Sequence, residues 1–106
     1  MRRLLLAILV LATLGSATTT LAASQCPGST TIEMRECAGR SLNESNTRLQ
    51  SKLSKTLLLQ WQQATRAACA RAYANYEDGT IYLQLMLSCD DQLNRALLKQ
   101  FQPLVN

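Results

Sequence analysis

Four cysteines are the residues of this 106-residue chain whose chemistry depends most on their spacing. They are Cys26, Cys37, Cys69 and Cys89, with 10, 31 and 19 residues between them. A zinc site needs thiolates or imidazoles in closely spaced pairs, and the chain has neither such a pair nor any histidine. In a small exported chain, four cysteines most simply form two disulfides, for which three pairings exist. The sequence therefore predicts two cross-links and no metal.

The other reactive groups give little support for catalysis. Without histidine the chain cannot assemble a Ser-His or Cys-His pair, and oxidised cysteines offer no thiolate nucleophile. Glu33 and Glu36 share a helix face, whereas the adjacent Asp90 and Asp91 point to different sides of their helix. At both places a structural role is favoured over the acid and base pair of a glycosidase. We therefore expect a protein that is not an enzyme and binds no cofactor.

A leader precedes the first cysteine. Two arginines are followed by an apolar run over residues 4–14 and then by small and polar residues up to Ala22 and Ala23. This order is typical of a secretory signal peptide, and the run is shorter than the ~20 residues that span a bilayer. We expect residues 1–23 to be removed, with cleavage near Ala22 or Ala23. Residues 24–106 would then form one periplasmic or secreted domain with no stable membrane insertion.

The mature chain is not expected to carry a lipid anchor or to bind nucleic acid or a membrane surface. A lipid anchor on Cys26 is the alternative to a freely diffusing protein, but Gln25 does not fit the small residue that such a site needs. Removing Arg2 and Arg3 leaves nine basic and seven acidic residues, a net charge of +2, without a block of like charges. This balance is too mild to indicate binding to nucleic acid or to a membrane, and it is typical of solvated helix faces.

The first helix has a clear start and an uncertain end. Thr30 and Glu33 are spaced as a capping box, so the helix should begin at about Thr31. Its apolar stripe runs from Met34 to Leu57, and no Gly or Pro marks where it stops. Whether helices one and two are separate or continuous is left open by this pattern. We favour a break near residues 54–56, because one long helix would leave its stripe without a partner.

Two further helices complete the predicted fold. The second stripe runs from Leu58 to Tyr76 and the third from Tyr82 to Phe101, with Gly79 between them and no segment typical of a strand. The sequence thus predicts a small all-α protein, a three-helix antiparallel bundle or hairpin stapled by two disulfides.

The turn at Gly79 selects one pairing of the cysteines. Cys69 and Cys89 lie ten residues to either side of it, so they come level with each other in an antiparallel pair. Cys26 is then left with Cys37, and the turn after Cys26 lets the preceding chain fold back along the first helix. A Cys37 link to Cys69 would instead staple helices one and two.

Several large or polar residues have both a structural and a functional reading. Asn46 lies on the inner stripe of the first helix, where an unpaired amide would be costly. An interhelical hydrogen bond that fixes the register is favoured over a contact with a ligand. Trp61, Tyr73 and Tyr76 are likewise expected in the core or at its rim rather than on a recognition surface.

The order of these features resembles the LprI-like lysozyme-inhibitor family, a group of small exported helical domains. The matching residues are Cys26, Thr30-Thr31-Ile32-Glu33-Met34 with Cys37, Asn46 with Leu49-Gln50, Gln60-Trp61, Cys69, Gly79-Thr80, Cys89 and Leu93. The resemblance extends from Cys26 to about Leu98 and implies a helical domain with four cysteines. Asn46 and Gln50 match by position alone, because the family tends to carry Asp and Asn there. The chain also departs from the pattern at Leu53, where the family tends to carry an aromatic residue, and at Thr65-Arg66, where it tends to carry an Arg-Asp pair.

The resemblance also implies a function. It predicts a periplasmic or secreted protein that inhibits lysozyme or a related peptidoglycan hydrolase by occluding its cleft, with an arginine or an amide meeting the catalytic carboxylates. The candidate contacts are Arg35, Arg40 and Arg48, on the polar side of the first helix, together with Asn46. The alternative is a structural or immunity-type envelope protein that binds another partner and does not inhibit lysozyme. An exposed apolar patch or a dimer in solution would favour that alternative.

Overall fold

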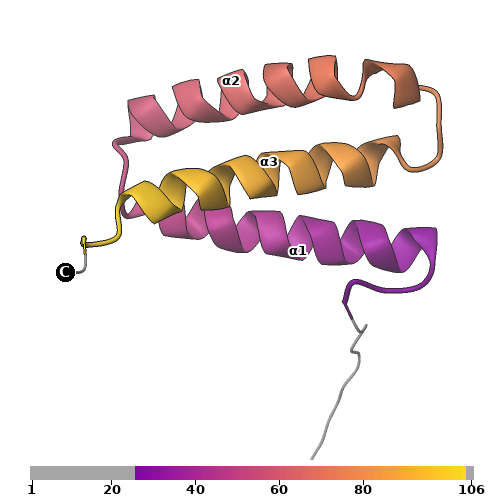
Figure 1. Ribbon diagram of the computed structural model, residues 1–106, viewed down its shortest axis with the longest axis horizontal. Helices are drawn as coiled ribbons and strands as arrows, with labels where there is room; N and C mark the ends of the chain where they lie inside the picture. The colour runs from indigo at the N-terminus through magenta and orange to yellow at the C-terminus, as the bar shows by residue number, and fades with distance from the viewer. Residues whose placement is uncertain (1–25, 105–106) are drawn as a thin grey trace, which may run out of the picture.

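The computed structural model describes residues 26–104, and the predicted leader with its cleavage site lies outside them. Within the described residues the chain forms α1 (Thr31–Gln50), α2 (Lys55–Ala72), the short 3-10 helix η1 (Ala74–Tyr76) and α3 (Tyr82–Gln100), with no strand. The expected small all-α protein of three helices is confirmed (Figure 1).

The third helix lies between the other two, and it packs mainly against α1 (Figure 1). Consecutive helices run antiparallel, so α1 and α3 run parallel to each other. Side-chain contacts between them join residues that are 50 apart along the chain at both Met34–Gln84 and Ser41–Asp91. The constant offset means that the C-terminal ends of α1 and α3 lie at the same end of the bundle.

The expected capping box begins α1. The backbone N–H of Glu33 donates to Thr30 Oγ1 over 3.1 Å, and the backbone N–H of Thr30 donates to Glu33 Oε1 over 3.2 Å. The backbone N–H of Ser29 also donates to Glu33 Oε1, over 2.9 Å, and this bond is the main reason that the pKa of Glu33 lies below its ordinary value. Gly28 reaches this turn with a φ of 85°, which L residues with a side chain rarely adopt.

The favoured break between helices one and two is also confirmed, a few residues earlier than expected. The helix α1 ends at Gln50, and Ser54 caps α2 by accepting a hydrogen bond from the backbone N–H of Leu57 over 3.2 Å. Leu57 was expected on the inner stripe of the first helix. It belongs instead to α2 and is half-exposed, because the break turns it away from the core.

Both predicted disulfides are present. Cys26 is bonded to Cys37 and Cys69 to Cys89, and no cysteine is free. The first bridge ties the preceding segment back onto α1, and the second joins α2 to α3 ten residues either side of Gly79.

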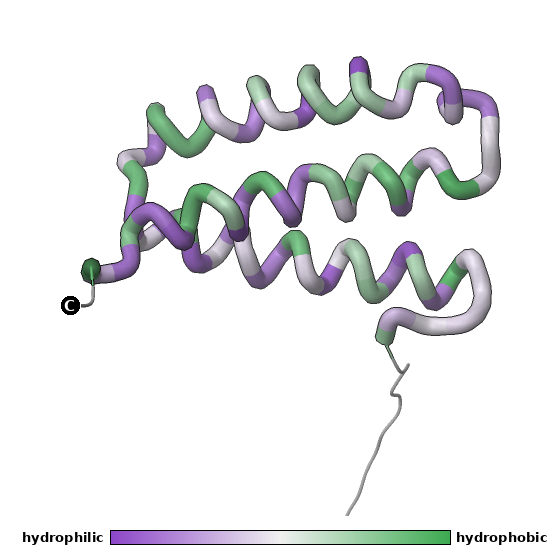
Figure 2. The backbone as a smooth tube through the Cα atoms, in the orientation of Figure 1, coloured by the Kyte–Doolittle hydropathy of each residue, from purple (hydrophilic) through white to green (hydrophobic). Residues whose placement is uncertain are grey.

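The apolar core is small and lies near the α1–α2 connection. Leu49, Leu58 and Leu98 are buried together, and Leu53, Trp61 and Leu97 pack against them. Figure 2 shows hydrophilic residues in the middle of α3, although this helix lies between the other two. Two residues that the sequence placed on apolar stripes, Tyr76 and Phe101, are exposed, because each lies at a helix end beyond the reach of a neighbouring helix. Much of the interior contact is therefore polar.

Candidate functional site

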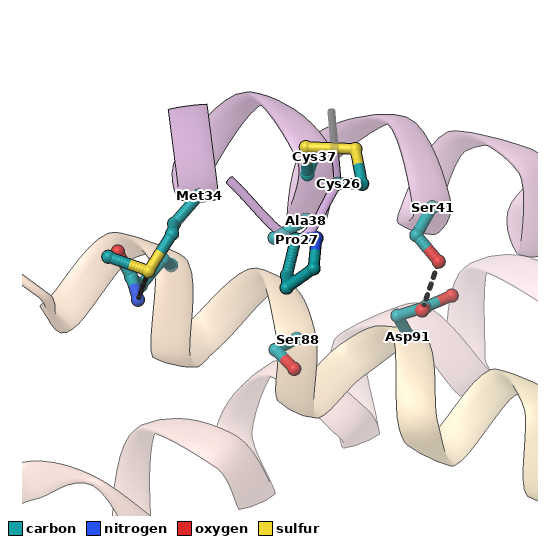
Figure 3. Close-up of a pocket in the computed structure, with 9 residues that line it drawn as sticks. Cys26, Pro27, Met34, Cys37, Ala38, Ser41, Ser88 and Asp91 are labelled. Atoms are coloured by element: carbon teal, nitrogen blue, oxygen red, sulfur yellow. Dashed lines mark hydrogen bonds between the residues drawn. A yellow bond between two sulfur atoms is a disulfide. The ribbon is translucent and has the colours of Figure 1, made fainter. Parts of the chain in front are cut away.

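A hollow of about 490 Å³ lies between the N-terminal segment, α1 and α3 (Figure 3). Pro27, Met34 and Ala38 form its apolar walls, and the bonded pair Ser41 and Asp91 lines one end. Ser41 and Asp91 are bonded to each other, whereas Gln84, which also lines the hollow, keeps its Oε1 buried without a hydrogen-bond partner among the described residues. One such atom does not make a set of converging groups, so the hollow is a gap along the α1/α3 interface.

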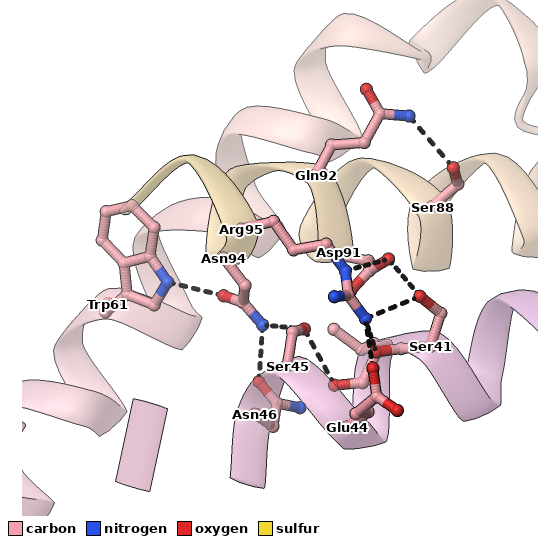
Figure 4. Close-up of polar contacts among 11 residues, drawn as sticks. Ser41, Glu44, Ser45, Asn46, Trp61, Ser88, Asp91, Gln92, Asn94 and Arg95 are labelled. Atoms are coloured by element: carbon pink, nitrogen blue, oxygen red, sulfur yellow. Dashed lines mark hydrogen bonds and ion pairs between the residues drawn. The ribbon is translucent and has the colours of Figure 1, made fainter. Parts of the chain in front are cut away.

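The carboxylate of Asp91 is the centre of that interface. It accepts a hydrogen bond from Ser41 Oγ over 2.6 Å, and Arg95 Nε donates to both of its oxygens over 3.0 and 3.2 Å (Figure 4). Burial alone would raise the pKa of Asp91, but its interactions with Ser41, Ser45 and Arg95 outweigh this effect and hold the pKa below its ordinary value. Asp91 is therefore an ionised structural group that fixes Arg95.

The guanidinium of Arg95 is held along one edge and open along the other. Its Nη2 donates to the backbone oxygen and the hydroxyl of Ser41 over 3.1 and 3.0 Å, and to Glu44 Oε1 over 3.0 Å. Its Nη1 has no hydrogen bond with any residue in 26–104, and Figure 4 draws no contact to one nitrogen of this guanidinium. The hydrogen bond to Glu44 is the main reason that the pKa of Arg95 is raised, so the cation is permanent.

A second polar cluster fixes the register of all three helices. Trp61 Nε1 donates to Asn94 Oδ1 over 2.7 Å, and Asn94 Nδ2 donates to Asn46 Oδ1 over 2.8 Å and to Ser45 Oγ over 3.0 Å (Figure 4). Asn94 is only 1% exposed. The interhelical hydrogen bond expected for Asn46 is confirmed, and the residue is half-buried.

The neighbouring Asp90 has the opposite environment, as its position on the helix predicted. It faces α2, where Thr65 and Arg66 lie beside it, and its Oδ1 is buried without a hydrogen-bond partner among the described residues. Burial raises the pKa of Asp90, and the contacts with Thr65 and Arg66 only partly offset this effect. Asp90 lines a cavity of about 80 Å³ between the three helices.

Positive charge gathers at the end of the bundle where α1 and α3 terminate. We call this the basic end, and it comprises Arg48, Lys52, Lys55, Arg95 and Lys99. Residues 44–55 and 92–104 hold these five cations and one carboxylate, whereas the rest of the described chain holds four cations and six carboxylates. The cations look dispersed along the sequence, and the parallel packing of α1 and α3 brings them together.

Two adjoining hollows of about 320 and 220 Å³ indent the basic end, and together we call them the basic groove. Arg48, Leu98 and Gln102 line both hollows; Phe101 lines the larger, and Arg95 and Lys99 line the smaller. Phe101 is 42% exposed. Lys52 also lines the larger hollow, so the basic groove combines a partly apolar floor with four cationic side chains, of which Arg95 is already fixed in position.

The structure separates the three arginines that the sequence proposed as contacts. Arg48 lines the basic groove, whereas Arg40 lies against the first disulfide, with its Nη2 3.2 Å from Cys26 Sγ. Arg35 is exposed and lies roughly 140° around the helix from each of the other two, at 3.6 residues per turn. They do not form one surface. Arg95 was not among the residues predicted from the sequence. It lies four residues after Asp91, which is a recognisable spacing for an ion pair on a helix.

Residues 26–104 contain no group of three or more histidine, cysteine or acidic side chains placed to hold a metal ion. No helix in this part of the chain combines the length and the apolar character needed to cross a membrane.

Comparisons of the chain with protein-family models, with curated proteins and with solved structures gave no match. The LprI-like resemblance therefore stands on the residues quoted from the sequence.

Proposed function

We propose that this chain is an exported binding protein that inhibits a lysozyme or a related peptidoglycan hydrolase by occluding its cleft. The basic groove carries the proposal, because Arg48, Arg95 and Lys99 surround its partly apolar floor. Glycosidases of this kind cleave with a pair of carboxylates in an open cleft. Guanidinium groups bind carboxylates through two parallel hydrogen bonds, and Arg is enriched where proteins recognise one another.

The rigidity of the basic end supports this function. Arg95 is oriented by Asp91 and Ser41 before any partner arrives, and the cross-link between Cys69 and Cys89 ties α2 to the helix that carries it. A surface that is already ordered loses less conformational entropy on binding, so more of the contact energy remains as affinity.

The uneven charge supports it as well. A net charge of +2 for residues 26–104 gives no overall attraction to lysozymes that are themselves basic. The basic end, however, has four more positive than negative side chains across residues 44–55 and 92–104. Such a local excess orients an approaching acidic cleft toward the basic end even when the net charges of the two molecules repel each other.

Inhibition of lysis is the direct test. The exported protein, with both disulfides formed, should slow the lysis of peptidoglycan by an animal-type or a goose-type lysozyme at concentrations near its dissociation constant. The same protein after reduction and alkylation should lose most of this effect, because its surface is no longer ordered. Absence of both inhibition and binding toward the two lysozyme types would reject the proposal for these enzymes.

A second candidate is an envelope protein that binds another partner and leaves lysozyme untouched. It is favoured by apolar side chains exposed around the α2–α3 connection, at the opposite end from the basic groove: Tyr76, Ile81 and Leu83. Sedimentation equilibrium separates the two candidates, since a dimer whose dissociation follows Leu83→Ser and Ile81→Ser would place the main interface at this apolar end.

A further inference from the structure

Arg95 has the geometry of a preorganised carboxylate receptor. A guanidinium offers five N–H donors in a planar fork. In Arg95, Asp91 takes Nε, and Ser41 with Glu44 takes Nη2, which leaves Nη1 for the basic groove. Its side chain is 35% exposed, so the open edge can be reached from outside.

Glu44 differs from the other acceptors of Arg95. Its side chain is 67% exposed, and within residues 26–104 it makes one polar contact, the 3.0 Å ion pair between Arg95 Nη2 and Glu44 Oε1. Ser41 and Asp91, by contrast, are partly or fully buried in the α1/α3 interface. An exposed ion pair of this kind contributes little free energy, so an arriving carboxylate can replace Glu44 at small cost.

The surroundings of Arg95 select among anions. Arg48 and Lys99 share the smaller hollow with it, and Leu98 continues into the larger hollow, where Phe101 is half-exposed. A phosphate polymer would use the cations but not the apolar floor. A protein segment that carries a carboxylate beside an apolar side chain would use both.

We propose that the basic groove binds such a segment, with its carboxylate on Arg95 beside Arg48 and Lys99 and its apolar side chain on Leu98 and Phe101, and that Glu44 competes for Arg95. This inference rests on the proposed function only for the identity of the partner, a hydrolase. The chemistry of the segment follows from the groove itself.

The test is a titration followed by nuclear magnetic resonance of the ¹⁵N-labelled exported protein at low ionic strength. The probe is the peptide acetyl-Asp-Phe-Glu-amide. Two control peptides remove one feature each: acetyl-Asn-Phe-Gln-amide lacks the carboxylates, and acetyl-Asp-Gly-Glu-amide lacks the apolar side chain. Inorganic phosphate is a fourth probe. The side-chain N–H signal of Arg95 and the backbone signals of Leu98 and Phe101 report binding at the groove.

The expected result has three parts. The first peptide shifts signals at the basic groove, and each control peptide and phosphate binds at least fivefold more weakly. Glu44→Gln tightens binding of the first peptide about two- to fivefold, the range that corresponds to loss of an exposed ion pair. Arg95→Gln weakens it at least fivefold, while Arg71→Gln, the same change on an exposed arginine of α2, has less than a twofold effect.

Three results would overturn the inference. They are equal binding of the amide peptide, phosphate binding as tight as the first peptide, or unchanged or weaker binding in Glu44→Gln. The outcome is independent of lysozyme. If the peptide binds as expected and no hydrolase is inhibited, the proposed function fails and the groove assignment stands. If a hydrolase is inhibited and no peptide binds, the inhibitory surface lies elsewhere.

Discussion

The two faces of α3 are built on different principles. Toward α1 the contact is a parallel, hydrogen-bonded interface in which Asp91 is fully paired with Ser41 and Arg95. Toward α2 the contact is sparser and covalently closed by Cys69 and Cys89, and Asp90 keeps an unpaired buried oxygen there. Two adjacent aspartates thus have opposite surroundings. Toward α1, hydrogen bonds fix the position of Arg95, although Gln84 Oε1 is buried on that side without a partner among the described residues. Toward α2, the disulfide supplies the connection beside the unpaired Asp90.

Loss of the second disulfide should have the largest effect on this comparison. Replacing Cys69 and Cys89 by Ala should lower the free energy of unfolding by about 2 to 5 kcal/mol, because α2 then lacks its cross-link to α3. The matched control, Cys26→Ala with Cys37→Ala, opens a shorter loop and should cost roughly 0.5 kcal/mol less in the chain-entropy model. Urea denaturation measures both. An equal or larger loss from the control, whose bridge does not cross between helices, would mean that the α2–α3 cross-link contributes no special stability to the bundle.

Asn94 connects the α1 and α2 contacts of α3, because it bonds to Asn46 of α1 and to Trp61 of α2. Asn94→Ala would leave Trp61 Nε1 and the Asn46 amide without their buried partner, so the free energy of unfolding should fall by about 1 to 3 kcal/mol. Gln92→Ala, at an exposed position on the same helix, is the control and should change it by less than about 0.5 kcal/mol. Similar values for both variants, again from urea denaturation, would mean that the polar cluster does not contribute to stability.

The adjacent aspartates should give opposite dependences of stability on pH. The pKa of Asp91 is lowered in the folded protein, so its contribution is present above the pKa of the unfolded chain and is lost as the pH falls through the folded pKa. The pKa of Asp90 is raised, so its contribution is present below the unfolded pKa and is lost as the pH rises through the folded pKa.

Isosteric amides test this difference. At pH 7, Asp91→Asn should lower the free energy of unfolding by about 1 kcal/mol or more, and Asp90→Asn should leave it unchanged or raise it by up to about 1 kcal/mol. The two values should converge in acid. Thermal unfolding from pH 3 to pH 7 measures both variants against the wild type, and effects of the same sign at pH 7 would remove the distinction between the two faces.

Local features of this fold were predictable from sequence, and those that depend on packing were not. Thr30 and Glu33 form a cap within one turn, and Cys69 and Cys89 lie symmetrically about Gly79, so spacing alone identified them. Asn46 was predictable because a polar residue on an apolar stripe needs a partner, although the sequence did not identify Asn94 as that partner. Leu57, Tyr76 and Phe101 were predicted on apolar stripes but are exposed. Helical periodicity shows which side of a helix is apolar, but it does not show where a neighbouring helix ends.

Most of the candidate site could not be predicted from the sequence, because it too depends on how the helices pack. Arg48 was selected from the first helix alone, together with Arg35 and Arg40, which the structure places outside the basic groove. Arg95 and Lys99 join Arg48 only because α1 and α3 run parallel, and the sequence pattern indicated antiparallel neighbours without fixing the third pairing. Charges that look dispersed in one dimension can therefore form a single surface.

The central claim is that the basic groove is the docking surface, and one pair of variants tests it most directly. For a lysozyme that the wild type binds, isothermal titration calorimetry compares two double variants. The groove variant combines Arg48→Gln and Lys99→Gln, and the control variant combines Arg35→Gln and Arg71→Gln, which removes the same charge from two exposed positions outside the basic groove. The groove variant should bind at least tenfold more weakly, since each cation at the contact contributes about 1 kcal/mol or more, and the control variant should stay within about twofold of the wild type. Equal weakening by the two double variants, or greater weakening by the control variant, would contradict the claim.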